Sequence, residues 1–283
     1  RTFSPVAIVK PFPALLPDAS RASEICELPY DVMSTAEAKQ MAEGRPCSFL
    51  HVSRPEIDLP EGTATNDPSV YAKARENFDR LIAEGALRRD GQAHFYLYRQ
   101  IMGEHTQLGL VAVASCAEYD ANTIRKHEFT RPDKEDDRVA HLEVLDAQTG
   151  PVFLTYSADA ELDALFDRVA AGEPDVDFTA PDGVRHTSWT IAAGEDTAFV
   201  ESRFDGIPNL YIADGHHRSA AASRVNQSRS GAGTSDLFLT VIFPHDQMQI
   251  LAYNRAVKDL NGLSIDEFRT ALGVHVVRET RMF

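Results

Sequence analysis

The apolar positions along the chain change their period several times, and each period predicts one kind of element. Between residues 67 and 87, apolar side chains recur every three or four positions, which is typical of an amphipathic helix. Residues 93–119 form two long apolar stretches around a polar turn at 103–106, the pattern of an antiparallel hairpin. A second hairpin is predicted over residues 175–191, with a Pro-Asp-Gly turn at 181–183.

Shorter patterns complete the predicted order of elements. Ser34 followed by Glu37 is typical of a helix start, and we expect this helix to end at Gly44. Residues 236–257 form a last predicted hairpin. The other predicted helices cover residues 133–150, 158–172, 195–204, 216–227 and 264–272, and the other predicted strands cover residues 47–57, 151–157, 209–215 and 274–277. Residues 6–17 are predicted to begin as a strand and to continue into a proline-rich turn.

The order of these elements predicts the fold class. Hairpins alternate with isolated helices without a regular strand–helix–strand rhythm, so we expect an α+β fold with a central mixed sheet. The 283 residues suit a single α+β domain or two intimately packed lobes, at about 1–150 and 151–283. Because the sequence stops just after the predicted strand at 274–277, we expect it to end inside a larger domain.

Charge and cysteine content narrow the class of protein. There are 28 Lys and Arg against 43 Asp and Glu, a net charge of −15, which repels a polyanion such as nucleic acid but allows a small basic pocket for a nucleotide. The three cysteines are odd in number and form no CxxC pair, which favours a reducing cytoplasm. No apolar run approaches the ~20 residues that span a bilayer, so no membrane partner is expected.

A first candidate site lies where the predicted strand at 209–215 becomes an alanine-rich helix. Asp214 and Gly215 turn the chain, and His216, His217 and Arg218 open the helix. The first-turn amides of a helix have no intrahelical partner and carry partial positive charge, so this group of residues favours a bound phosphate. The alternative is that Asp214 only caps the helix and that both histidines are solvated.

A second candidate is the charged segment at 125–138. Apolar Ile124 and Phe129 indicate that part of it is anchored, and Lys134 and Arg138 would share one helix face beside Glu135. A carboxylate framed by basic groups suits a general base beside an anionic substrate. The alternative is an ordinary solvated charged loop. The candidate residues of this segment are His127, Glu128, Thr130 and Arg138.

Two further patterns concern residues 28–34 and metal binding. In residues 28–34, Asp31 follows an aromatic residue and is either a binding residue or part of a simple Asx-type turn. Zinc is not expected, because adjacent histidines on a helix point about 100° apart and neither HExxH nor a cysteine pair is present. A P-loop and a GxGxxG motif are also absent from the sequence.

Four motifs carry a resemblance to a known family: PYDV at 29–32, HEFT with KEDDR at 127–138, IADGHHR at 212–218, and YNRAVKDLNG at 253–262. They occur in this order in a bacterial and archaeal family, domain-of-unknown-function family 1015. The chain is identified as a member on these motifs, and the resemblance covers most of its length.

The DGHHR segment also resembles the phosphate-binding turn of the ParB/sulfiredoxin-like superfamily, whose Gly-x-x-Arg box here is Gly215 to Arg218. Free-serine kinases of that superfamily carry a similar DGHHR and transfer a phosphoryl group from ATP or ADP to L-serine. The resemblance implies a ParB/sulfiredoxin-like element around residues 205–245 and a small-molecule kinase that uses ATP or ADP with Mg²⁺. A ParB-like nucleotide switch or NTPase, or a non-catalytic interaction module, are the alternatives.

The kinase hypothesis gives each candidate residue a role. Glu128 is the base or binds the substrate ammonium, Asp214 holds Mg²⁺ or accepts the hydroxyl proton, and His216 contacts the transferring group. The phosphate ligands are Gly215, His217, Arg218 and Arg138, and the small-molecule substrate is bound by Asp31, His127 and Thr130.

Overall fold

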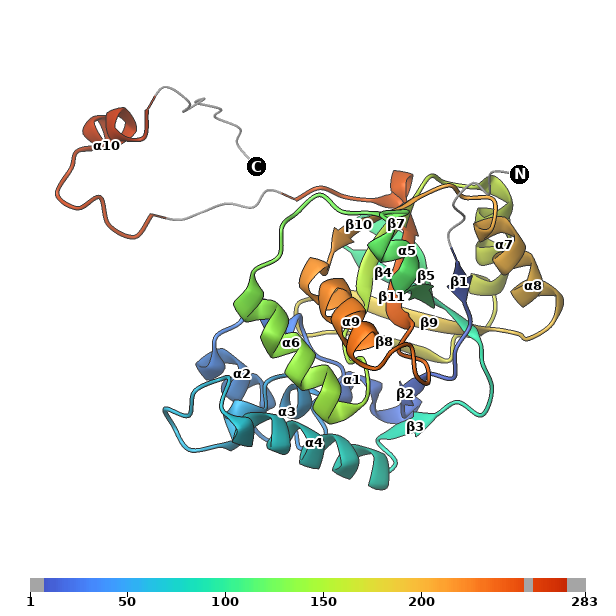
Figure 1. Cartoon of the computed structure of the whole chain (residues 1–283), viewed down its shortest axis with the longest axis horizontal. Helices are drawn as coiled ribbons and strands as arrows, with labels where there is room; N and C mark the ends of the chain where they lie inside the picture. The colour runs from blue at the N-terminus through green and yellow to red at the C-terminus, as the bar shows by residue number, and fades with distance from the viewer. Residues whose placement is uncertain (1–7, 252–256, 274–283) are drawn as a thin grey trace. The chain divides into compact units, whose positions relative to one another are not determined.

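The computed structural model describes residues 8–251 and 257–273 of the chain, and Figure 1 shows their arrangement. Residues 8–248 form one compact unit, and a second unit begins at Gln249. The first unit contains a mixed sheet of nine strands with flanking helices, which confirms the predicted α+β class. The predicted strand at 274–277 lies outside the described residues.

The sheet has the strand order β6-β10-β7-β11-β5-β4-β9-β8, and β1 pairs with the far end of β5. Two pairs are parallel, β6 with β10 and β7 with β11, and the others are antiparallel. A separate antiparallel pair joins β2 (Leu15–Pro17) and β3 (Leu87–Arg89). The strands of the large sheet are β1 (Val9–Lys10), β4 (Phe95–Met102), β5 (His105–Ser115), β6 (Ile124–Arg125), β7 (Val152–Tyr156), β8 (Val176–Thr179), β9 (Arg185–Ile191), β10 (Leu210–Asp214) and β11 (Leu237–Pro244).

Ten α-helices lie within the described residues. The 3₁₀ helices are η1 (Ala19–Arg21), η2 (Tyr30–Val32), η3 (Pro55–Asp58) and η4 (His245–Gln247). The α-helices are α1 (Ala22–Ile25), α2 (Thr35–Ala42), α3 (Leu50–Ser53), α4 (Pro68–Ala83), α5 (Cys116–Asp120), α6 (Pro132–Leu145), α7 (Ala160–Ala170), α8 (Glu195–Phe204), α9 (His216–Ser228) and α10 (Ile265–Ala271).

The main core lies on one face of the sheet. Alternate side chains of neighbouring strands, such as Leu97, Leu110 and Ile242, are fully buried there with apolar residues of α5, α7, α8 and α9. Helix α9 packs against β7 and β11, and its contact residues are small, including Ala220 and Ala222. Small side chains let the helix axis approach the sheet closely, and only Gly215 separates the start of α9 from the end of β10.

A second group of helices, α1 to α4, packs on the other side of α6 from α9 (Figure 1). Its apolar cluster includes Val52 of α3, Phe78 of α4 and Leu145 of α6. Helix α6, which begins with the later part of the charged segment at 125–138, therefore contacts both α4 and α9.

Several local predictions are confirmed. The hairpins at 93–119 and 175–191 are β4–β5 and β8–β9, and the helix predicted at 67–87 is α4. At α2, the Ser34 side chain accepts from the Glu37 amide, while the Glu37 carboxylate accepts from the Ser34 amide at 2.7 Å. Each of these features depends on contacts between residues close in sequence.

The strand predicted at residues 47–57 is wrong, because this segment forms α3 and η3. Leu50 is buried in a cluster with α2, whereas Val52 is buried in the cluster with α4. A short helix can bury neighbouring apolar residues on two of its sides. A continuous apolar run in the sequence does not by itself distinguish such a helix from a buried strand.

Three other predicted elements differ from the structure in pairing or in extent. The last predicted hairpin is wrong in its pairing, since β11 is bonded on both sides, to β5 and β7, and η4 follows it. Part of the expected second arm, residues 252–256, lies outside the described residues. The strand predicted at the start of residues 6–17 is β1, and the end of the predicted proline-rich turn forms β2, which belongs to a different sheet. The helix predicted at 133–150 ends at Leu145, because Asp146 adopts a left-handed conformation with φ of 48°.

Candidate functional site

The turn between β10 and α9 is built around Gly215, whose φ of 92° lies in the region that glycine tolerates best. A Cβ atom at this position would also lie 3.1 Å from Nε of Arg218. Arg218 folds back over the turn, where its Nη2 donates to Asp214 at 2.6 Å and its Nη1 donates to the Pro151 carbonyl. Asp214 therefore pairs with Arg218, and no side chain caps α9 among the described residues.

His216, the first residue of α9, is 3% exposed and contacts Glu128. Its Nδ1 lies 3.5 Å from Oε2 of Glu128, and the ring of His127 packs edge-on against the His216 ring at 4.5 Å between centroids. Burial is the main cause that lowers the pKa of His216, with His127 adding to it, so the imidazole is neutral at pH 7. Its Nε2 is buried without a hydrogen-bond partner among the described residues.

The segment that carries Glu128 is held at both of its ends. Lys126 donates to the Tyr119 carbonyl at 2.8 Å, and the Arg131 amide donates to Nε2 of His217 at 3.1 Å. His217 therefore serves as an acceptor for this segment in the structure. The Glu128 side chain itself is 61% exposed, so a small molecule can reach its carboxylate.

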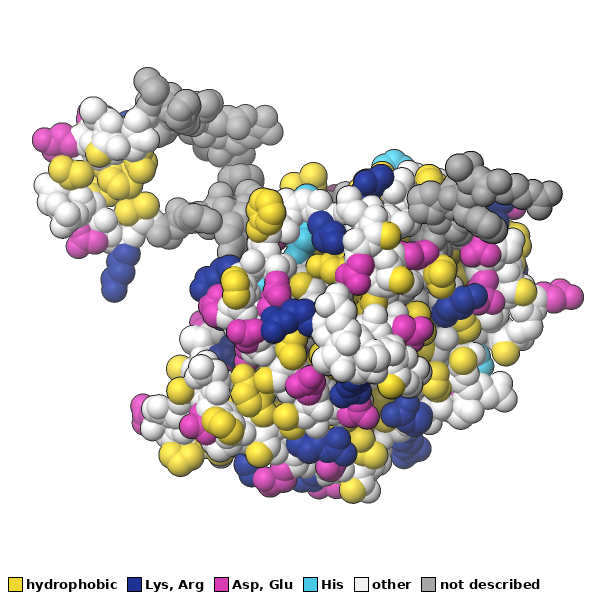
Figure 2. All heavy atoms as spheres, in the orientation of Figure 1, with side chains coloured by type: hydrophobic (Ala, Val, Ile, Leu, Met, Phe, Trp, Pro, Cys, Tyr) yellow, Lys and Arg dark blue, Asp and Glu magenta, His cyan; other side chains and the backbone are white. Residues whose placement is uncertain are grey.

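Glu135, the carboxylate that the sequence places between Lys134 and Arg138, makes structural contacts. It accepts from Thr130, and it forms an ion pair with Arg224 of α9 at 3.2 Å. Figure 2 shows acidic and basic side chains mixed over this face of the molecule. Part of the charged segment at 125–138 thus joins α6 to α9.

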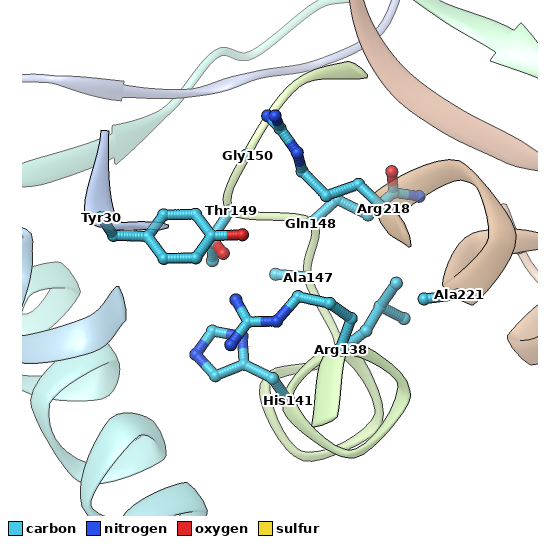
Figure 3. A pocket seen from close by; sticks show the side chains of 10 residues that line it. Tyr30, Arg138, His141, Ala147, Gln148, Thr149, Gly150, Arg218 and Ala221 are labelled. Carbon is cyan, nitrogen blue, oxygen red and sulfur yellow. The ribbon is translucent and has the colours of Figure 1, made fainter. Parts of the chain in front are cut away.

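A cavity of ≈ 40 Å³ lies next to the turn, between η2, α6, α9 and the loop that precedes β7. Figure 3 shows the Arg138 guanidinium beside the His141 ring and the Arg218 guanidinium beside Gly150, with the Tyr30 ring at one side. Arg138 also forms an ion pair with Asp137 at 2.6 Å. The other lining residues are Leu142, Ala147, Gln148, Thr149 and Ala221.

Two arginines line this cavity, and each is paired with a neighbouring carboxylate, Arg138 with Asp137 and Arg218 with Asp214. The Arg138 guanidinium stacks on the Tyr30 ring at 4.9 Å, and its Nε and Nη2 donate to Asp137 at 3.0 and 2.6 Å. Burial, followed by the charge of Arg138, lowers the pKa of His141 to about 4. His141 is therefore neutral at pH 7, and the two arginines carry the positive charge of the cavity.

A family model matches residues 9–281 of the chain, with the description "Protein of unknown function (DUF1015)". The chain belongs to this family. No curated protein and no solved structure matches the chain significantly. The DUF1015 match spans both the sheet and the helices that surround the cavity, but its description names no activity.

The structure divides the predicted site residues of this DUF1015 member into two groups. Arg138 and Arg218 line the cavity, while Glu128 and His127 contact His216. Residues two apart on a helix point ~200° apart, so His216 and Arg218 lie on different sides of the first turn of α9. The predicted residues therefore do not all line one cavity, although both groups meet at the N-terminus of this helix.

The other predicted residues lie around these two groups. Asp31 is exposed on η2, and it is its neighbour Tyr30 that lines the cavity. Thr130 donates to Glu135 and Asp214 is paired with Arg218. Gln148, Thr149 and Gly150 were missed because the helix predicted at 133–150 included them, although the polar Gln-Thr-Gly run before a strand is typical of a loop.

Two properties bear on cofactors and location. Within residues 8–251 and 257–273, no three His, Cys, Asp or Glu side chains converge as a metal cage. Mg²⁺ in nucleotide sites uses only one or two carboxylates besides the phosphates and waters, so the single carboxylate of Asp214 fits that mode of binding. In the part of the chain that the structure describes, the helices are too short or too polar to cross a bilayer.

Proposed function

We propose that this chain is a small-molecule kinase that transfers a phosphoryl group from ATP or ADP to the hydroxyl of a free amino acid, with L-serine as the foremost candidate. The observation that carries the proposal is that Arg138 and Arg218, from different motifs, line one cavity beside the uncapped start of α9. Phosphoryl transfer depends mainly on positioning and on neutralising the charge of the phosphate. The proposal includes a cytoplasmic location, where nucleotides and free amino acids are available.

The size of the cavity suits a phosphate group. A volume of ≈ 40 Å³ is several times the ~10–15 Å³ that one water molecule needs by the same measure. Arg218 has five N–H donors, of which one is used on Asp214 and one on Pro151. In the proposed complex the remaining donors of Arg218, together with Arg138 and the amides after Gly215, bind phosphate oxygens.

The acceptor hydroxyl would bind on the Glu128 side of the helix terminus. The Glu128 carboxylate is exposed to substrate, and neutral His216 lies close enough to orient it. We assign Glu128 as the general base or as the ligand of the substrate ammonium, and His216 as a contact of the transferring group. His127, Thr130 and Asp31 are assigned to substrate binding beside them.

Asp214 is the residue that would hold Mg²⁺. When the nucleotide phosphates engage Arg218, the Asp214 carboxylate is released from its ion pair and can bind a cation carried by those phosphates. Mg²⁺ supplies charge neutralisation between the phosphates. An anion on the helix axis would lie between Arg218 and His216, which is how the two residue groups would act together.

The test is to incubate the protein with ATP or ADP, Mg²⁺ and a mixture of free amino acids, and to follow phosphorylated amino acids by mass spectrometry. We expect a phosphorylated product that requires both nucleotide and protein, and that is lost in Arg218→Ala. Nucleotide hydrolysis without any phosphorylated amino acid would instead support the ParB-like switch or NTPase. Absence of nucleotide binding would exclude both and favour an interaction module.

A further inference from the structure

We propose that the protein has a second ligand site, which binds a small zwitterionic α-amino acid between Arg99 and Asp167. Both residues line a cavity between β4, β5, the end of α7 and η4. None of its lining residues lines the Arg138–Arg218 cavity, and the inference does not depend on the proposed kinase activity.

Arg99 has an unusual environment. It lies on β4, opposite Leu108 and Thr187, and its guanidinium stacks on the Trp189 ring at 4.7 Å. Its Nε is buried without a hydrogen-bond acceptor, and within the described residues the Arg99 side chain takes part in no ion pair. A buried donor without an acceptor is unfavourable, and because Arg99 also lines the cavity without a carboxylate partner in the described part of the chain, its guanidinium favours an acceptor supplied by a ligand.

The space in front of Arg99 is large enough for a metabolite. Its volume is ≈ 530 Å³, within the ~300–1,000 Å³ that is usual for small-molecule sites. Asp167 lies on its wall as well, but no ion pair joins Asp167 to Arg99 in the structure. Because Arg99 and Asp167 line the same cavity without pairing with each other, a ligand that carries both charges can contact both. The remaining lining residues are Thr106, Leu108, Ala170, Ala171 and Gln247.

The chemistry of the walls selects the class of ligand. A guanidinium stacked on an aromatic ring presents its edge to a carboxylate, which it can bind through two parallel hydrogen bonds. An ammonium group is favoured at Asp167 and at the C-terminal end of α7, where the helix dipole is negative. An α-amino acid carries both groups on one carbon atom, and the apolar Leu108 and Ala170 leave space for a short side chain.

Neighbouring acidic residues disfavour a polyanion such as a nucleotide at this cavity. Burial raises the pKa of Asp163, and the nearby carboxylates of Asp246 and Asp167 raise it further, which shows that negative charge gathers along this side of α7. A ligand with no net charge avoids this repulsion while still satisfying Arg99.

Trp189 makes the site directly measurable, because it is the single tryptophan of the chain and is 3% exposed beneath Arg99. We would titrate the full chain with glycine, L-serine and L-aspartate and record the Trp189 emission. Acetate and ethylammonium serve as probes that carry only one of the two charges. We expect a saturable change with at least one amino acid, and a response to either single-charge probe that is weaker by about tenfold or more.

Variants of the charged residues test the two contacts. Arg99→Gln should abolish the change, and Asp167→Asn should weaken binding by about tenfold, since each removes a charge-assisted hydrogen bond. Arg168→Gln is the matched control, because Arg168 lies next to Asp167 on α7 but pairs with Asp196 at 2.7 Å, away from the cavity. It should bind as the wild type does. If Arg99→Gln does not fold, Arg99→Lys keeps the charge but loses the planar fork and should still weaken binding.

Three outcomes would overturn the inference. The first is that none of the amino acids gives a saturable change in emission. The second is that Arg99→Gln, or Arg99→Lys if the glutamine variant does not fold, binds amino acids as tightly as the wild type does. The third is an acetate response as strong as that of glycine. A failed kinase assay would not affect this test, because Trp189 reports only on its own surroundings.

Discussion

Nδ1 of His216 lies 3.5 Å from the Glu128 carboxylate, so the middle motif and the DGHHR motif meet at the start of α9. Glu128 reaches this position because the segment before α6 is held by the backbone contact of Arg131 to His217. The contact joins an exposed carboxylate to a buried neutral imidazole. Such a pair can orient a hydroxyl and remove its proton, and it is the basis of the prediction for Glu128 below.

Replacing Arg218 should affect nucleotide binding directly. Arg218→Ala removes charge-assisted hydrogen bonds worth roughly 1.5–3 kcal/mol each, so affinity for ATP and ADP should fall about tenfold or more. Isothermal titration calorimetry measures this change. Arg229→Ala is the control, because Arg229 caps the other end of α9 and pairs with Asp146 at 2.5 Å. Equal nucleotide affinity in Arg218→Ala and wild type would refute phosphate binding at this turn.

Glu128→Gln should separate chemistry from binding. The amide keeps the shape of the side chain but cannot act as a base, so turnover should fall by roughly 10²–10⁴-fold while the nucleotide still binds. Steady-state rates of phosphoserine formation, together with titration of ATP, provide the measurement. A rate within a few-fold of wild type would show that Glu128 is not the base.

Gly215→Ala should perturb the turn for two reasons. The left-handed φ of 92° costs a non-glycine residue about 1–2 kcal/mol, and the new Cβ would crowd Arg218 at 3.1 Å. We expect a loss of stability of that size in urea unfolding and weaker nucleotide binding. Gly233→Ala is matched, because Gly233 has φ of 68° with nothing within 4 Å of the added Cβ. The Gly233→Ala variant should lose stability but bind nucleotide as the wild type does. The prediction fails if Gly215→Ala and Gly233→Ala bind nucleotide with equal affinity.

His141 should make the stability of the protein depend on pH. Its Nε2 donates to the Val52 carbonyl at 3.0 Å, and burial lowers its pKa to about 4 from the usual 6.5. Between these values the unfolded chain binds a proton that the folded protein does not, so the free energy of unfolding falls as pH decreases from about 6.5 to about 4. A shift of this size corresponds to about 3 kcal/mol.

Urea unfolding at several pH values, compared between wild type and His141→Gln, isolates this contribution. The glutamine amide can still donate to Val52 but does not titrate in this range. The variant should therefore lose less stability than the wild type between pH 6.5 and pH 4. Parallel curves for the two proteins would contradict the assignment.

The sequence by itself was sufficient where structure depends on neighbours along the chain. The capping box of Ser34 and Glu37, the β8–β9 turn around Gly183, and the period of α4 all depend on contacts within a few residues. The Gly215 turn belongs to the same class, because glycine tolerates the positive φ of 92° that the turn requires. The sequence also identified Glu128, Arg138 and Arg218 as candidate residues, because charged residue types stand out in the motifs that carry them, although it did not establish their roles.

Tertiary packing decided the rest. Residues 47–57 are helical because Leu50 and Val52 are buried in different clusters, and β11 has no hairpin partner because β5 and β7 already occupy both of its edges. The cavity between Arg138 and Arg218 exists because α6 packs against α9, and the stacking of Arg99 on Trp189 exists because β4 pairs with β9. Such contacts join residues distant in sequence, and their geometry depends on how whole elements fit together, which no local pattern of residues encodes.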